Sequence, residues 1–233
     1  MPNPRIAPPT PPPILARIPQ AILRRLDLSI LVRDAMNASQ NPDTMSVIIA
    51  VSNLASYFEA ARHQQRRIQT ATKGQRGWRK PTRGRIFNEV HFYLICWARI
   101  ARLAKFIARR TRFRRAGFVL RRYLTDLEER REARDHLEHF EDRLPGGPKH
   151  GKLRVRGDLL NLLGDFLTYG GRKIDVGPKS LALLKAMVDE FRMALLFDCV
   201  EELHKADPNR LTLLLRRAAQ DVHLARLTKQ FQR

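Results

Sequence analysis

The chain has few cysteines and no long hydrophobic run. Its two cysteines among 233 residues, Cys96 and Cys199, both lie in apolar helical patterns. A disulfide framework or a cysteine-based metal cluster needs more cysteines at close spacing, so reduced, buried thiols are expected. The longest apolar run, residues 92–98, is far shorter than the roughly 20 residues that cross a bilayer. A cytoplasmic protein without stable membrane insertion is therefore expected.

Acidic residues are almost absent from one long segment. Residues 62–122 contain 19 lysines and arginines and a single acid, Glu89, in a chain of net charge +21. In residues 123–145 the sign reverses, with eight acids and four arginines. A solvated charged face is the ordinary interpretation of a charge run, but a long block without compensating acids repels itself and favours a polyanion such as RNA. The arginines predicted to bind RNA are the densest part of the block: Arg109, Arg110, Arg112, Arg114, Arg115, Arg121 and Arg122.

Aromatic residues are interleaved with this basic block. Trp78, Phe106, Phe113 and Phe118 either stack on unpaired bases or fill a core, and the sequence leaves both open. The basic and apolar segment 85–122 also fits association with an anionic membrane surface. However, its apolar residues are needed for a core and would then not be free to enter a membrane. This favours RNA over a membrane as the partner.

Prolines are concentrated at the N-terminus, where no apolar core of a signal peptide is recognised. Residues 1–43 hold 9 of the 14 prolines and are predicted to form a basic, mostly unfolded arm. Within the arm, the apolar spacing of residues 19–36 is also compatible with a short amphipathic helix.

Helical periodicity dominates the rest of the chain. Residues 158–176 differ and are predicted to form two short strands around Gly170-Gly171. The start signals Gly177-Pro178 and Asp207-Pro208 precede the last two helices. The helices are predicted over 44–67, 85–112, about 117–144, 178–206 and 208–230.

These elements predict an all-α fold, a bundle of four to five long helices with a small β-hairpin insertion and a Pro-rich N-terminal arm. The helical domain is expected to cover residues 44–206. Residues 207–233 are expected to form a C-terminal helix that packs on it.

One short motif points to a specific chemistry. Arg134 is followed directly by the polar Asp135, and His139 comes after three further residues. On the third long helix of a bundle, this pattern resembles the signature of the HEPN superfamily of helical ribonucleases. The resemblance covers about residues 44–206, and it rests on the motif and the architecture. The hairpin and the arm are departures from the minimal family domain.

The resemblance implies a metal-independent endoribonuclease that needs no cofactor. A neutral His139 imidazole accepts the proton of a ribose 2′-hydroxyl, whose oxygen attacks the adjacent phosphate. The Arg134 guanidinium stabilises the charge that develops there. Asp135 is placed to hold the tautomer of the histidine, and Glu138 to restrain the arginine. The resemblance also implies a homodimer in which two motifs meet, and a toxin or defence role with a protein inhibitor (antitoxin) as partner.

Three alternatives stay open at this point. The four motif residues also form ordinary i,i+4 pairs of opposite charge on a helix. A non-catalytic RNA-binding module requires only the basic block. A metal site at Glu132, His136 and His139 lacks a further strong ligand at a suitable spacing, so no metal is expected.

Overall fold

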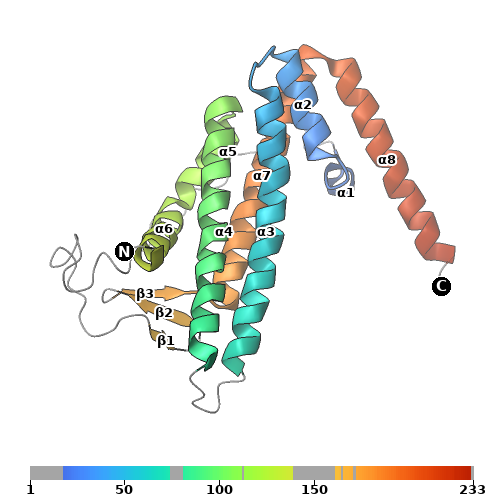
Figure 1. Cartoon of the computed structure of the whole chain (residues 1–233). Coiled ribbons are helices and arrows are strands. Elements are labelled where there is room, and N and C mark those ends of the chain that lie inside the picture. The colour runs from blue at the N-terminus through green and yellow to red at the C-terminus, as the bar shows by residue number, and fades with distance from the viewer. Residues whose placement is uncertain are drawn as a thin grey trace. The chain divides into compact units, whose positions relative to one another are not determined.

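The computed structural model describes residues 18–73, 81–111, 113–138, 161–163, 165–169 and 172–231 (Figure 1). Within these ranges it contains eight helices and three strands. In chain order they are α1 (Gln20–Leu23), α2 (Leu28–Ala38), α3 (Thr44–Lys73), α4 (Pro81–Thr111), α5 (Arg114–Arg122), α6 (Leu124–Glu138), β1 (Asn161–Leu163), β2 (Phe166–Tyr169), β3 (Arg172–Asp175), α7 (Pro178–Ala206) and α8 (Pro208–Phe231).

The predicted all-α class with a small sheet is confirmed. Helix α7 has the predicted bounds, and α8 begins at the predicted Pro208. The helix predicted over about 117–144 is different, because the chain forms two helices, α5 and α6, with a break at Tyr123. The reason is that the 3.6-residue apolar pattern continues through Tyr123, whose buried side chain fits either arrangement.

Residue contacts divide the chain into two compact units. The first takes its described residues from Met1–Ser52, Ala104–Arg122 and Asp189–Arg233. The second takes them from Asn53–Leu103 and Tyr123–Val188. Helices α3, α4 and α7 therefore contribute residues to both units.

Helix α2 belongs to the core of the first unit. The Asp27 carboxylate caps its N-terminus by accepting hydrogen bonds from the amides of Ser29 and Ile30, at 2.8 and 3.2 Å. Five of its residues are buried: Leu28, Leu31, Val32, Ala35 and Met36. Within the arm predicted over residues 1–43, a short helix over residues 19–36 was left open, and the structure has α1 and α2 there. The unfolded arm is therefore corrected for residues 20–23 and 28–38. The burial of this apolar face offsets the entropy that ordering the segment costs.

An ion pair joins α2 to α8 within the first unit, and α1 packs against α8. The Arg210 Nε of α8 donates to the Asp34 carboxylate of α2 at 2.7 Å. Leu211, Leu214 and Ala218 of α8 are buried. The expected packing of this helix on residues 44–206 stays a prediction, because the contacts named here join it to α1 and α2.

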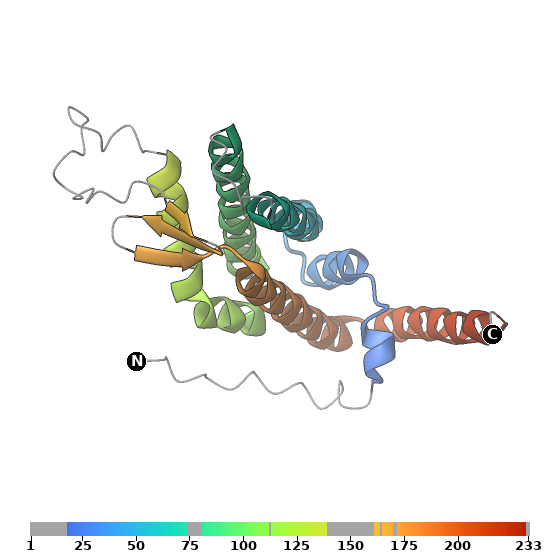
Figure 2. The same cartoon turned by 90° about the horizontal axis from the view of Figure 1, so that it is seen from below.

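The sheet belongs to the second unit and has the antiparallel order β1-β2-β3. Strands β2 and β3 pair Leu167 with Ile174, and both side chains are buried. They form the predicted hairpin, whose Gly170-Gly171 turn lies outside the described residues. Strand β1 was not predicted. In both views β3 lies beside α6, to which Arg172 is joined by an ion pair with Glu132 (Figures 1 and 2).

The buried side chains of α4 and α7 fill the second unit. Tyr93 and Trp97 are 0% and 1% exposed, and they are the largest fully buried side chains of this core. The Tyr93 hydroxyl hydrogen-bonds the hydroxyl of Ser180 at 3.0 Å. Burial raises the pKa of Tyr93, and the bond to Ser180 partly offsets that effect. Ser180 lies in the first turn of α7, which this bond ties to α4.

Among the described residues, one helix is long and apolar enough to cross a membrane by length and composition alone. It is α3, over Thr44–Thr72, where 33% of the most apolar stretch is buried inside the protein. Core helices of soluble proteins pass the same test, and Val47, Ala50 and Val51 of α3 are buried. The expected absence of membrane insertion stays a prediction.

Candidate functional site

Three of the four predicted catalytic residues lie on the last two turns of α6. The Arg134 side chain is only 13% exposed, and it forms an ion pair with the carboxylate of Asp135. Its Nε lies 3.2 Å from Oε2 of Glu138. Glu138 therefore restrains Arg134 as the i,i+4 spacing predicted. His139 lies outside the described residues.

Asp135 was expected to hold the tautomer of His139, and this stays a prediction because His139 lies outside the described residues. In the described contacts Asp135 pairs with the neighbouring Arg134. Two carboxylates thus hold one guanidinium, which has five N–H groups to share between them and a phosphate. The arrangement fixes the direction of the Arg134 side chain.

A second histidine, His91 of α4, approaches this cluster. Its Nε2 lies 3.5 Å from Oε1 of Glu138, so Glu138 stands between His91 and Arg134. The His91 ring stacks on the neighbouring Phe92, which is 53% exposed. Sequence reasoning missed His91, because nothing local to residue 91 signals a contact with a residue 47 positions later.

The metal alternative gains no support. The described residues contain no group of three or more His, Cys, Asp or Glu side chains placed to hold a metal ion. Glu132 is paired with Arg172, and His136 is 5% exposed. His139, the third member of the alternative, is outside the described residues.

The predicted RNA-binding arginines separate into two groups. Arg109 and Arg110 at the end of α4 are exposed, as are Arg114 and Arg121 of α5. Arg115 and Arg122 are half-buried and form ion pairs within the first unit, Arg122 with Glu190. Arg112 lies outside the described residues. Four of the seven arginines are therefore exposed, Arg109, Arg110, Arg114 and Arg121, and of these Arg110 also pairs with Asp43.

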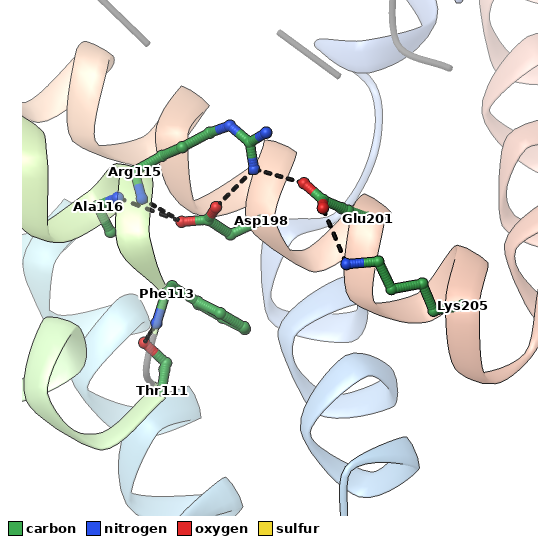
Figure 3. Close-up of polar contacts among 7 residues, drawn as sticks. All are labelled: Thr111, Phe113, Arg115, Ala116, Asp198, Glu201 and Lys205. Atoms are coloured by element: carbon green, nitrogen blue, oxygen red, sulfur yellow. Dashed lines mark hydrogen bonds and ion pairs between the residues drawn. The ribbon is translucent and has the colours of Figure 1, made fainter. Parts of the chain in front are cut away.

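Arg115 is held by Asp198, which also caps helix α5 (Figure 3). The Asp198 Oδ2 accepts hydrogen bonds from the amides of Arg115 and Ala116, at 3.0 and 3.2 Å. Its Oδ1 accepts one from the Arg115 guanidinium at 2.9 Å. The same guanidinium nitrogen donates to Glu201 at 2.7 Å, and Glu201 accepts from Lys205 at 2.9 Å. Arg115 and Asp198 together therefore stabilise the start of α5. This structural role of Arg115 could not be predicted from the sequence.

The acidic residues of this network have opposite pKa directions. Burial raises the pKa of the Asp198 carboxyl, and the bonds from Arg115 and Ala116 only partly offset it. The hydrogen bonds from Lys205 and Arg115 lower the pKa of Glu201. Glu201 is the more exposed of the two, so desolvation affects it less.

The aromatic residues of the basic block have different surroundings, as far as the structure describes them. Phe106 supports Arg110, whose guanidinium carbon lies 5.7 Å from the ring centroid. Phe113 and Phe118 are half-buried, and Trp78 lies outside the described residues. In the second unit, Trp97 is buried beneath the guanidinium of Arg130, 4.3 Å from its ring centroid. Phe113 also lines a cavity of the first unit, so part of its surface faces that cavity.

Comparison with known proteins gives no match: no family model fits the chain, and no curated protein and no solved structure matches it. The function must therefore be argued from these residues themselves.

Proposed function

We propose that this protein is a metal-independent endoribonuclease of HEPN type. The observation that supports it most is the restrained Arg134 in the last turns of α6. This helix ends at Glu138, the residue before His139 of the motif. A guanidinium with a fixed direction loses less entropy when it binds a phosphate, and this is what transition-state stabilisation requires.

The proposed reaction is a transesterification within the RNA strand. His139 removes the proton of a ribose 2′-hydroxyl, and the 2′-oxygen forms a bond to the adjacent phosphorus. The bond from phosphorus to the 5′-oxygen breaks, and that oxygen takes up a proton. The products are a 2′,3′-cyclic phosphate and a 5′-hydroxyl. One imidazole supplies the base, and the motif of a second copy in a homodimer supplies the acid.

The substrate would be bound through the exposed arginines of the first unit. Arg109, Arg110, Arg114 and Arg121 are exposed, and the basic segment that contains them has one acid, Glu89. Glu89 is itself near Arg67, with Oε1 3.4 Å from the Arg67 Nε. Release of counterions from RNA makes such binding strong at low salt and weak at high salt.

A second candidate function, RNA binding without cleavage, is favoured by one observation. The Arg134 side chain is 13% exposed and is already engaged by two carboxylates. A phosphate must compete with both for the guanidinium. A family descendant in which Arg134 only stabilises α6 would retain the exposed arginines and bind RNA without cutting it.

The two candidates are separated by a cleavage assay in EDTA with single-stranded RNA. We expect His139→Ala and Arg134→Ala each to reduce the rate at least about 100-fold, because each removes a group that acts in the transition state. Matched controls are His204→Ala, which changes an exposed histidine of α7, and Arg131→Ala, which changes an exposed arginine of α6. A 2′-deoxy substitution at the cleaved position should abolish the reaction.

Cleavage by both motif variants at the parental rate would refute the nuclease, and RNA binding without any cleavage would favour the second candidate. In a cytoplasmic toxin or defence effector, expression of the parent would slow growth while the His139→Ala protein would not. A protein inhibitor, where one exists, would relieve the effect of the parent.

A further inference from the structure

The first unit contains a partly open cavity of about 550 Å³. Its wall is formed by the connection between α2 and α3, residues 39–43, together with the end of α4, Phe113 and Glu202 of α7. The volume lies within the range of sites that hold small ligands or single nucleotides. None of the motif residues on α6 lines this cavity.

Several polar groups in the wall are already used by the protein. Asn41 donates to the carbonyl of Arg110 at 3.0 Å and accepts from the amide of Asp43 at 2.9 Å. Asp43 accepts from the Arg110 guanidinium at 3.2 Å. The Thr111 hydroxyl donates to the carbonyl of Ile107 and accepts from the amide of Phe113. These bonds fix the wall before a ligand arrives.

Three other polar side chains in the wall remain available. The side chains of Arg109, Glu202 and Gln40 make no hydrogen bond or ion pair with another residue in the part of the chain that the structure describes. Gln40 also has a φ of 51°, a left-handed conformation that is uncommon for a residue other than glycine. Phe113 adds a half-buried ring, which Figure 3 shows beside α7. The available groups are thus a cation, a carboxylate, an amide and an aromatic face.

A ligand that satisfies all four must combine an anion, N–H donors and a flat ring. We infer that this cavity holds one unpaired guanine nucleotide of an RNA strand. The inference rests on the RNA binding proposed above and not on cleavage. The phosphate pairs with Arg109, the base stacks on Phe113, and the Glu202 carboxylate accepts from the base edge.

Guanine is favoured over the other bases by the chemistry of Glu202. An ionised carboxylate only accepts hydrogen bonds, and its two oxygens match two parallel donors. Guanine presents a ring N–H and an amino group side by side on its pairing edge, whereas adenine, cytosine and uracil each offer donors at one position there. Recognition of unpaired bases on this edge is how proteins usually read single-stranded RNA.

The test is the affinity of the full chain for short single-stranded RNAs that differ at one position, guanosine against inosine or adenosine. The His139→Ala background prevents cleavage during the measurement. We expect guanosine to bind about tenfold more tightly, the value of one good paired contact. Glu202→Gln should remove this preference with little change for adenosine, and Arg109→Ala should weaken all three RNAs.

Arg121→Ala is the matched control, since it removes an exposed arginine of the same unit that does not line the cavity. It should weaken RNA binding and keep the guanosine preference. Binding of all three RNAs with equal affinity overturns the inference and leaves the proposed RNA binding intact. Absence of binding to every RNA at low salt overturns both. A preference that survives Glu202→Gln also overturns the inference, because the carboxylate is then not its source.

Discussion

Helices α5 and α6 follow each other in the sequence, are both rich in arginine, and neutralise that charge in different ways. In α6 the arginines pair with acids of their own helix, such as Arg134 with Glu138 and Arg131 with Glu128. In α5 the paired arginines depend on α7, where Asp198 holds Arg115. The difference shows that local sequence decides the charge of α6, whereas the tertiary structure decides which arginines of α5 remain exposed.

The largest expected effect concerns RNA binding by the exposed group. Changing Arg109, Arg110, Arg114 and Arg121 together to Gln should lower the low-salt affinity for single-stranded RNA by about 100-fold or more. The slope of log affinity against log salt should fall by about 3, since each contact with a single strand contributes roughly 0.7. Filter binding from 50 to 200 mM salt measures both. Arg131→Gln in α6 should change the slope little, and an equal effect of the two would break the comparison.

The second effect concerns the stability of the paired group. Asp198→Ala should lower the free energy of unfolding by about 3 kcal/mol, because it leaves the Arg115 guanidinium and two amides at the start of α5 without their acceptor. Urea unfolding followed by circular dichroism measures it. Glu128→Ala, which removes the i,i+3 partner of Arg131 in α6, should cost at most about 0.5 kcal/mol. Similar losses of unfolding free energy in Asp198→Ala and Glu128→Ala would contradict the difference drawn between α5 and α6.

Arg130 sharpens the comparison, because it is the buried arginine of α6, 5% exposed, whereas Arg131 and Arg134 of the same helix are more exposed. Its guanidinium covers the ring of Trp97, and its Nη1 donates to the carbonyl of Asp126 at 3.1 Å. Arg130→Ala should cost about 2 kcal/mol of unfolding free energy through lost packing and the lost cation–π contact. Arg130→Met, which keeps an apolar stem, should cost less. An equal cost would show that packing contributes nothing.

The smallest expected effect is a pH dependence in the α5 network. The pKa of Glu201 is lowered in the folded protein, so its stabilisation is present above the unfolded pKa of about 4.3 and is lost as the pH falls. Glu201→Gln should remove about 0.5 kcal/mol of stability at pH 7 and less at pH 3, after allowance for its exposure. The raised pKa of Asp198 acts with the opposite sign. Unfolding of parent and variant in urea between pH 3 and 7 measures the difference.

The parts of the fold that could be predicted are those with local signals. Pro178 and Pro208 begin α7 and α8 because proline suits the first helical turn. Strands β2 and β3 flank a Gly-Gly turn, as expected of a hairpin. The break at Tyr123 and the strand β1 carry no comparable signal, so tertiary packing decides them.

In the candidate site too, contacts between residues close in sequence could be predicted, and contacts between distant residues could not. Glu138 was expected to restrain Arg134 because the two are four residues apart on one helix, and the structure contains that pair. His91 and Asp198 were missed, since their partners lie far along the chain. Arg115 was assigned to RNA for its charge alone, and only the position of Asp198 distinguishes it from the exposed Arg114.

The cap that Asp198 provides has a consequence for synthesis. The amide of Arg115 and its acceptor are 83 residues apart, and the chain is made from the N-terminus. While the residues up to Asp198 are still being added, the first amides of α5 lack the carboxylate that accepts their hydrogen bonds in the folded protein. The cap of α5 therefore forms only after α7 has been synthesised, and the folding of this helix depends on a segment made much later.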